Sequence, residues 1–217
     1  MAANPDRISN VGSGPYATSS LPVPRRRYWL FLVVTSVSCY ADLLSKRLVF
    51  SWRGMPGEQP IWWLWPNFVG IETSLNTGAL FGIGHGQVWF FAIFSAVALV
   101  GLVCWFVYAS LGHDRLLTLI LAGVAGGILG NLYDRLGLWS LPTVDGQRIY
   151  AVRDWIRLSW GEHVWPNFNL ADSLLVCGAG LLVCHSFWVG RTRENEPKDK
   201  LGTEQAAKRD RSETLPN

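Results

Sequence analysis

Four long apolar runs dominate the sequence and limit what this chain can fold into. They extend from about residue 28 to 50, from 88 to 110, from 116 to about 133, and from 170 to 190. A membrane helix needs roughly 20 mostly apolar residues to cross a hydrocarbon core of about 30 Å. Apolar residues make up 49% of the chain and charged residues only 16%, against roughly 25% charged residues in soluble domains. The sequence therefore predicts an all-α membrane protein with four transmembrane helices.

Basic residues near the ends of these runs predict the orientation of the helices. Three arginines at 25–27 precede the first run, Arg115 stands between the second and third, and Arg191 and Arg193 follow the fourth. Both termini are therefore expected in the cytoplasm. The opposite segments also carry arginines, so the bias is clear without being absolute.

The segments outside the apolar runs divide into two kinds. Residues 1–27 and 191–217 are polar and without periodicity, which is typical of disordered tails. They flank an expected membrane domain of residues 28–190. The outward segments 51–87 and 136–169 instead contain clusters of tryptophan, a residue enriched at membrane interfaces. These two segments are expected to form a small extracytoplasmic structure that rests on the membrane.

The first apolar run has a second interpretation. Val37, Ser38 and Cys39 follow three arginines and an apolar stretch, as in the cleavage region of a lipoprotein precursor. A retained helix is favoured, because Ser36 is a poor residue three positions before the cysteine and a long polar tail precedes the basic region.

Polar side chains gather at one depth in this orientation. Ionisable groups inside membrane helices are costly, so those present usually have a function or a partner. Acids at the outer halves or ends of three runs, together with acids and amides of the adjoining outer segments, form this group: Asp42, Asp134, Asp172, Asn76, Asp154 and Asn169.

Ion pairing is the structural alternative for two of these acids. Asp42 and Lys46 stand four residues apart in the favourable order, and Asp134 adjoins Arg135, which could neutralise it locally. Asp172 has no basic residue near it in the sequence that would have to pair with it. Arg153 adjoins Asp154, but this does not require the two residues to pair. Two carboxylates held close do not both ionise easily. Such a pair can hydrolyse a peptide bond without a metal, one acid activating water while the other polarises the carbonyl.

Other chemistries find little support in the sequence. The four histidines are isolated and no zinc motif is present, so no metal or other cofactor is expected. The net charge of +3 comes from the two ends, which argues against nucleic-acid binding. A transporter with intramembrane acids and a non-catalytic scaffold remain rivals. Glycines 126, 127 and 130 have a spacing that permits close helix packing.

Five short motifs resemble those of the lipoprotein signal peptidase family, also called signal peptidase II. They occur in the family's order and run from about Asp42 to Leu175. The motifs are Asp42 to Lys46 (DLLSK), Asn76 to Phe81 (NTGALF, with Gly78), Gly126 to Arg135 (GGILGNLYDR, with Asn131 and Asp134), Val152 to Ile156 (VRDWI) and Phe168 to Ser173 (FNLADS). The family usually has an apolar residue where Arg153 stands and a shorter segment after the third motif.

The resemblance implies an aspartic endopeptidase of the bacterial cytoplasmic (inner) membrane. It implies four helices with a small extracytoplasmic β-containing cradle, and an active site at the outer face. The substrate would be a prolipoprotein whose cysteine bears a diacylglyceryl group, cut on the N-terminal side of that cysteine. Membrane lipid is then the other expected partner, and the protein is expected to act as a monomer.

The resemblance also implies roles for individual residues. Asp154 and Asp172 would be catalytic. Eight other residues of the five motifs would bind the substrate or support the two catalytic acids: Asp42, Lys46, Asn76, Gly78, Asn131, Asp134, Arg135 and Asn169. Asp145 competes with Asp154 for the first catalytic position, because its distance from Asp134 is nearer the family's. Asp154 is favoured, since Asp145 precedes glycine in a turn signal.

Overall fold

Four long helices form the main part of the computed structural model, which describes residues 23–78, 86–109, 111–140 and 147–194. The helices are α1 (Arg25–Arg53), α2 (Val88–Tyr108), α3 (Arg115–Arg135) and α4 (Leu170–Glu194). By length and composition, all four can cross a membrane. The four predicted helices are therefore confirmed. Asp145 and most of the two predicted tails lie outside the described residues.

A small antiparallel sheet is the second part of the fold. Its strands β1 (Trp62–Trp65), β2 (Val69–Asn76), β3 (Val152–Trp160) and β4 (His163–Phe168) are neighbours in that order. Gly161 makes the tight β3–β4 turn at a φ of 57°, a left-handed conformation that glycine adopts without strain. The expectation of a β-containing structure beside the helices is therefore confirmed.

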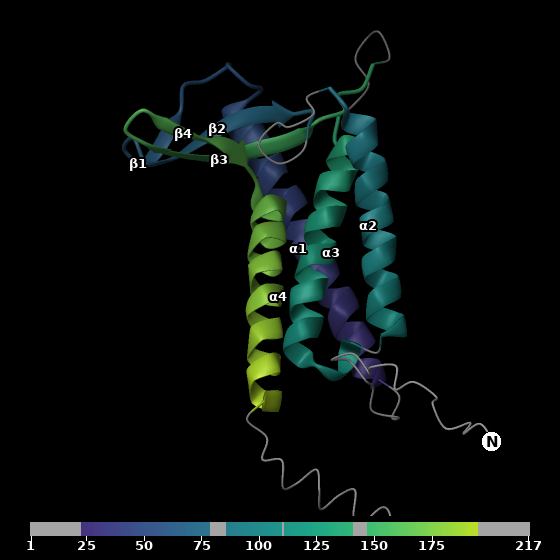
Figure 1. Ribbon diagram of the computed structural model, residues 1–217. Helices are drawn as coiled ribbons and strands as arrows, with labels where there is room; N and C mark the ends of the chain where they lie inside the picture. The colour runs from purple at the N-terminus through teal and green to yellow at the C-terminus, as the bar shows by residue number, and fades with distance from the viewer. Residues whose placement is uncertain (1–22, 79–85, 110, 141–146, 195–217) are drawn as a thin grey trace, which may run out of the picture. The chain divides into compact units, whose positions relative to one another are not determined.

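The chain forms two compact units, residues 1–181 and 182–217. In the first unit, α3 lies beside both α1 and α2, and the sheet lies at the end where α1 and α3 finish and α4 begins (Figure 1). The described part of the second unit is the C-terminal portion of α4. The sheet therefore adjoins the helix ends at which the predicted polar residues stand.

Glycine allows α1 and α3 to come close together. A Cβ added at Gly126 would lie 2.5 Å from Ser38 Cβ and 2.8 Å from the Thr35 carbonyl oxygen. The Thr35 hydroxyl donates to the Ala122 carbonyl oxygen at 3.1 Å, a bond between the same two helices. α3 is also the most buried of the four spans. The predicted close packing at the α3 glycines is therefore confirmed.

Candidate functional site

Asp154 is held on β3 by the pairing of that strand with β2. Ser74 is its register partner, and Asn76 pairs with Val152 at the end of the same ladder. The side chain of Asp154 is 1% exposed. Successive side chains of a strand point to opposite faces, so Asp154 and Arg153 face different surroundings.

Asp172 is held by the start of α4. The Asn169 side-chain oxygen accepts from the Asp172 backbone N–H at 2.9 Å, and the Asp172 carboxylate accepts from the Asn169 N–H at 3.3 Å. This reciprocal pair is a capping box, in which N-cap and third helical residue satisfy each other's free backbone donors. The residue types that start the helix therefore also fix the position of the Asp172 carboxylate.

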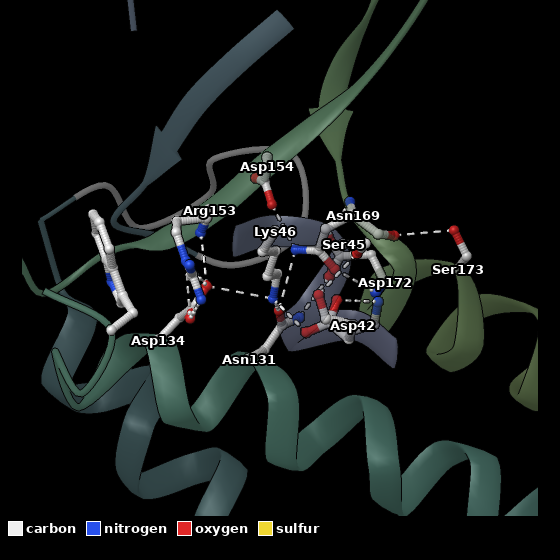
Figure 2. Close-up of polar contacts among 12 residues, drawn as sticks. Asp42, Ser45, Lys46, Asn131, Asp134, Arg153, Asp154, Asn169, Asp172 and Ser173 are labelled. Atoms are coloured by element: carbon white, nitrogen blue, oxygen red, sulfur yellow. Dashed lines mark hydrogen bonds and ion pairs between the residues drawn. The ribbon is translucent and has the colours of Figure 1, made fainter. Parts of the chain in front are cut away.

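Two amide side chains connect the carboxylates of Asp154 and Asp172. Asn169 donates to Asp154 Oδ1 at 2.6 Å, and Asn131 of α3 donates to Asp172 Oδ1 at 2.8 Å. Asn169 also donates to Asn131 Oδ1 at 3.1 Å. Figure 2 shows the side chains of Asp154, Asp172, Asn131 and Asn169 gathered in one cluster. Two acids that are 18 residues apart in sequence thus belong to one hydrogen-bonded cluster.

Lys46 of α1 is a fully buried cation in contact with this cluster. Its Nζ donates to Asn131 Oδ1 at 2.8 Å and forms ion pairs with Asp42 at 2.7 Å and Asp134 at 3.4 Å. Asp42 also accepts from the Ala171 N–H at 2.9 Å, which ties α1 to the first turn of α4. The predicted Asp42–Lys46 pair is confirmed, and Lys46 fixes the orientation of the Asn131 amide.

Arg153 neutralises Asp134, which the sequence analysis did not predict. Its Nη2 lies 2.8 Å from Asp134 Oδ1, and its backbone N–H donates to Asp134 Oδ2 at 3.0 Å. Local neutralisation of Asp134 by Arg135 is therefore wrong. The Arg135 guanidinium instead donates to the carbonyl oxygen of Gly78 and the hydroxyl of Ser95. The sequence did contain a signal for this pair, because Arg153 directly precedes Asp154, where the family usually has an apolar residue. The sequence analysis interpreted it only as a departure from the family pattern.

The segment after β2 completes the cluster. Asn76 Oδ1 accepts from the Gly78 N–H at 2.9 Å, and the Asn76 side chain also hydrogen-bonds Asp154. Arg135 reaches the Gly78 carbonyl oxygen at 3.3 Å. All ten residues that the sequence analysis proposed for the site are therefore linked by contacts within the described part of the chain.

Burial changes the protonation of Asp154. Removal from water, and then the nearby Asp172 carboxylate, raise the pKa of Asp154 to about 7. Hydrogen bonds from Asn169 and Asn76 and the charge of Lys46 oppose this rise. Near neutral pH, Asp154 therefore both holds and releases a proton, as a general acid or base must.

Two cavities meet at Asp172 and Asn76. One, of about 270 Å³, is lined by Trp165, Phe168 and Val176 between β4 and α4. The other, of about 260 Å³, is lined by Phe91 and Phe94 of α2, with Arg135. Both are mostly apolar at their walls, so the Asp172 carboxylate lies where two mostly apolar cavities meet.

The arrangement suits acid–base chemistry carried by two carboxylates. Among the described residues, no group of three or more histidine, cysteine or acidic side chains is placed to hold a metal ion. A charged carboxylate and a protonated carboxyl group in one cluster can activate water and polarise a carbonyl at the same time.

Comparisons with known proteins agree on one family. The family model of signal peptidase (SPase) II matches residues 34–188. A lipoprotein signal peptidase of Rhodopirellula baltica is 42% identical over 80% of this chain and 78% of the relative. That of Aquifex aeolicus is 36% identical over 79% of this chain and 93% of the relative.

Solved structures share the fold. A bacterial membrane enzyme determined by the in meso method at 2.3 Å resolution superposes with a TM-score of 0.63 at 22% identity, over 77% of this chain and 93% of the other. A second such structure, at 1.9 Å, gives a TM-score of 0.57 at 23% identity, over 72% and 91%. From the family match and the identity to these relatives, the chain belongs to the signal peptidase II family of membrane proteases.

Proposed function

We propose that this protein is an aspartic endopeptidase that removes signal peptides from diacylglyceryl-modified prolipoproteins. The observation that carries the proposal is the pair of buried carboxylates, Asp154 and Asp172, held together by Asn169. The bond cut lies on the N-terminal side of the lipidated cysteine. Family membership and the names of the relatives support the substrate class.

The two acids have different surroundings, which suggests different roles. Asp172 accepts from Asn131 and from the backbone at the start of α4, and both a helix N-terminus and donated hydrogen bonds favour a charged carboxylate. Asp154 has its pKa raised by burial and by Asp172, which favours the protonated form. Asp172 is therefore the base and Asp154 the acid.

The reaction then balances with water as the nucleophile. Asp172 takes a proton from water as the water oxygen bonds to the scissile carbonyl carbon, while Asp154 donates its proton to the carbonyl oxygen. When the tetrahedral intermediate collapses, one of its hydroxyl groups returns a proton to Asp154, the carbon–nitrogen bond breaks, and the cysteine nitrogen takes the proton held by Asp172. The products are a signal peptide with a new carboxyl group and a lipoprotein with a free amino group.

The remaining residues hold the acids or the substrate. Asn131 and Asn169 orient the carboxylates, and Asp42, Lys46 and Asp134 fix Asn131 and the start of α4. Asn76 lines both apolar cavities and Arg135 lines one of them, while Gly78 is hydrogen-bonded to both residues; these three would contact the substrate backbone. The cavities would take the signal peptide and the acyl chains.

The proposed setting is the bacterial inner membrane. Residues 28–190 form the peptidase domain, both termini are cytoplasmic, and the sheet and active site lie at the outer face. The distribution of arginines near the span ends supports this orientation. The lipid of the substrate would then hold the scissile bond at the outer interface.

The decisive experiment is cleavage of a synthetic diacylglyceryl-modified precursor peptide by the purified protein, followed by mass spectrometry. Wild type should give one cut before the modified cysteine, unaffected by a chelator. Asp154→Asn and Asp172→Asn should each lower the rate by at least about a hundredfold, the lower bound for one acid–base group. Near-normal cleavage by Asp172→Asn would refute the mechanism.

The same assay separates Asp154 from its competitor. Asp145→Asn removes the other acid that the sequence offers for the first catalytic position, and should leave the rate near that of wild type. An inactive Asp145→Asn beside an active Asp154→Asn would reverse the assignment without affecting the family membership.

A further inference from the structure

A third cavity, away from the carboxylates of the active site, lies between α1 and α3. It has a volume of about 500 Å³ and is lined by Tyr40, Leu43, Leu44, Arg47, Tyr133, Trp139 and Arg153. Neither Asp154 nor Asp172 lines it. Its walls combine apolar side chains, three aromatic rings and two guanidinium groups.

The α1 wall of this cavity is a stripe along one helix face. Tyr40, Leu44 and Arg47 stand at the i, i+4 and i+7 spacing that aligns side chains on a helix. All three are exposed, Tyr40 at 66% and Leu44 at 37%. The stripe thus presents an apolar and aromatic surface that ends in a cation.

Arg47 lies close to the boundary of the hydrocarbon core. α1 has 29 residues, so it is about 44 Å long at 1.5 Å per residue. This exceeds a core of roughly 30 Å, and its last turns extend into the headgroup layer. Arg47 precedes the end of α1 by six residues (53 − 47). Its long side chain can place the guanidinium among headgroups while the stem stays on apolar surface.

Among the charged residues in and next to the cavity, Arg47 is the one whose charge is not balanced by an acid of the described part of the chain. Arg153 is paired with Asp134, and Lys46 is paired with Asp42 and Asp134, so these four charges cancel. Within residues 23–78, 86–109, 111–140 and 147–194, no ion pair or hydrogen bond involves the Arg47 side chain. The guanidinium of Arg153 uses Nε and Nη2 for Asp134 and lies over the Trp139 ring at 4.9 Å. The cavity therefore carries a net positive charge at its polar end.

We propose that this cavity binds one anionic phospholipid, with the phosphate at Arg47 and an acyl chain along Leu44 and Tyr40. Arginine matches phosphate geometry with two parallel N–H donors, and tyrosine and tryptophan rings prefer the interface. A zwitterionic lipid brings its own cation and gains less from Arg47. The proposal does not depend on the proposed proteolysis, because none of the paired carboxylates takes part.

The test measures lipid binding to the full-length protein in a non-ionic detergent by native mass spectrometry. Phosphatidylglycerol and phosphatidylcholine with the same acyl chains are titrated separately. Wild type should retain one phosphatidylglycerol at concentrations where phosphatidylcholine is lost. Arg47→Gln should weaken phosphatidylglycerol binding by about tenfold, in line with the loss of one charge-assisted hydrogen bond. Arg26→Gln, an exposed arginine at the other end of α1, should bind as wild type.

Three results would overturn the proposal. They are equal retention of the two lipids, unchanged binding by Arg47→Gln, and an equal loss in Arg26→Gln. Glycerol phosphate serves as the soluble phosphate probe, and binding as tight as that of the lipid would overturn the assignment to a lipid. Peptide cleavage by Arg47→Gln in the same detergent should match wild type, so that failure of the lipid site and failure of the proposed protease mechanism are read separately.

Discussion

Asp154 is the site residue whose protonation depends most directly on the fold. Strand β3 removes it from water, and Asp172 brings a second acid close, so that the pKa of Asp154 rises to about 7. An acid with a raised pKa keeps its proton at low pH and loses it as the pH passes through that value. Because the proposed mechanism needs this proton, the loss should appear in the rate.

Cleavage should therefore fall on the alkaline side of about pH 7. The measurement is a profile of kcat/KM against pH with the diacylglyceryl-modified peptide, which reports the free enzyme. Asn169→Ala removes a hydrogen bond that lowers the Asp154 pKa, so the residual activity of this variant should fall at higher pH than in wild type. A constant kcat/KM up to about pH 9 would contradict the assigned role of Asp154.

Arg153 gives a second prediction at the residue scale. Arg153→Leu leaves the buried Asp134 carboxylate with Lys46 as its one remaining ion-pair partner among the described residues. Breaking a buried pair from one side costs about 3 to 5 kcal/mol. The variant should unfold at a lower temperature in detergent and cleave at least about tenfold more slowly, because β3 keeps its backbone hydrogen bond to Asp134 but loses the side-chain contacts that hold it there beside Asp154.

Two further variants control this result. Adding Asp134→Asn to Arg153→Leu removes the buried carboxylate that has lost its arginine partner and should restore part of the thermal stability. Arg157→Leu breaks a partly exposed pair with Glu72 and should change stability by no more than about 1 kcal/mol. An Arg153→Leu protein as stable as wild type would contradict the neutralising role.

The sequence allowed prediction of the site members better than of their contacts. Asp154, Asp172 and Asn169 could be proposed from motifs, because those residue types carry the chemistry. That Lys46 contacts Asn131 could not, because those residues are 85 positions apart and meet only when α1 and α3 pack. The ion pair between Arg153 and Asp134 was not predicted either, because Arg135, the next residue in the sequence, was expected to neutralise Asp134.

At the scale of elements, α3 is the helix against which the others are placed. Gly130 faces the Asp42 carboxylate so closely that an added Cβ would overlap it. Gly127 in turn faces the carbonyl oxygen of Ala171, at 2.8 Å from an added Cβ. The same helix face therefore sets the distance to α1 and to the start of α4.

Gly130→Ala should accordingly displace the Asp42–Lys46 pair and reduce both stability and cleavage. Overpacking of a close contact typically costs about 1 to 3 kcal/mol. Gly123→Ala is the matched control on α3, because its Cβ would find Leu174 at an ordinary 3.9 Å. Thermal unfolding in detergent compares the two, and equal effects would contradict a specific role for the contact at Gly130.

Helices and sheet differed in how far they could be predicted. The helices follow from apolar runs, which are local, and their bounds agree to within a few residues. The sheet pairs β2 with β3 across 80 residues, Ser74 opposite Asp154 (154 − 74). The register also shifts between Ile71 and Ser74, so side-chain alternation would not have given it.

At the scale of the whole molecule, the distribution of arginines predicts how the helices are oriented in the membrane. The arginines near the span ends predict that both termini and the turn between α2 and α3 share the cytoplasm. Reporter fusions after Asn217 and after Gly112 should therefore behave alike, and opposite to a fusion after Gly57. A C-terminal reporter on the outer side would contradict four spans in this orientation and the proposed position of the active site.

The pairing of Asp134 with both Lys46 and Arg153 has a consequence for biosynthesis. α1 leaves the ribosome with Asp42 and Lys46 four residues apart, so this ion pair can form as soon as the helix forms. α3 carries its acid 19 residues ahead of Arg153. Until Arg153 has been translated, Lys46 of α1 is the ion-pair partner already available to Asp134. We expect α1 and α3 to associate before the sheet forms, and Asp154 and Asp172 to come together as one of the last steps of assembly.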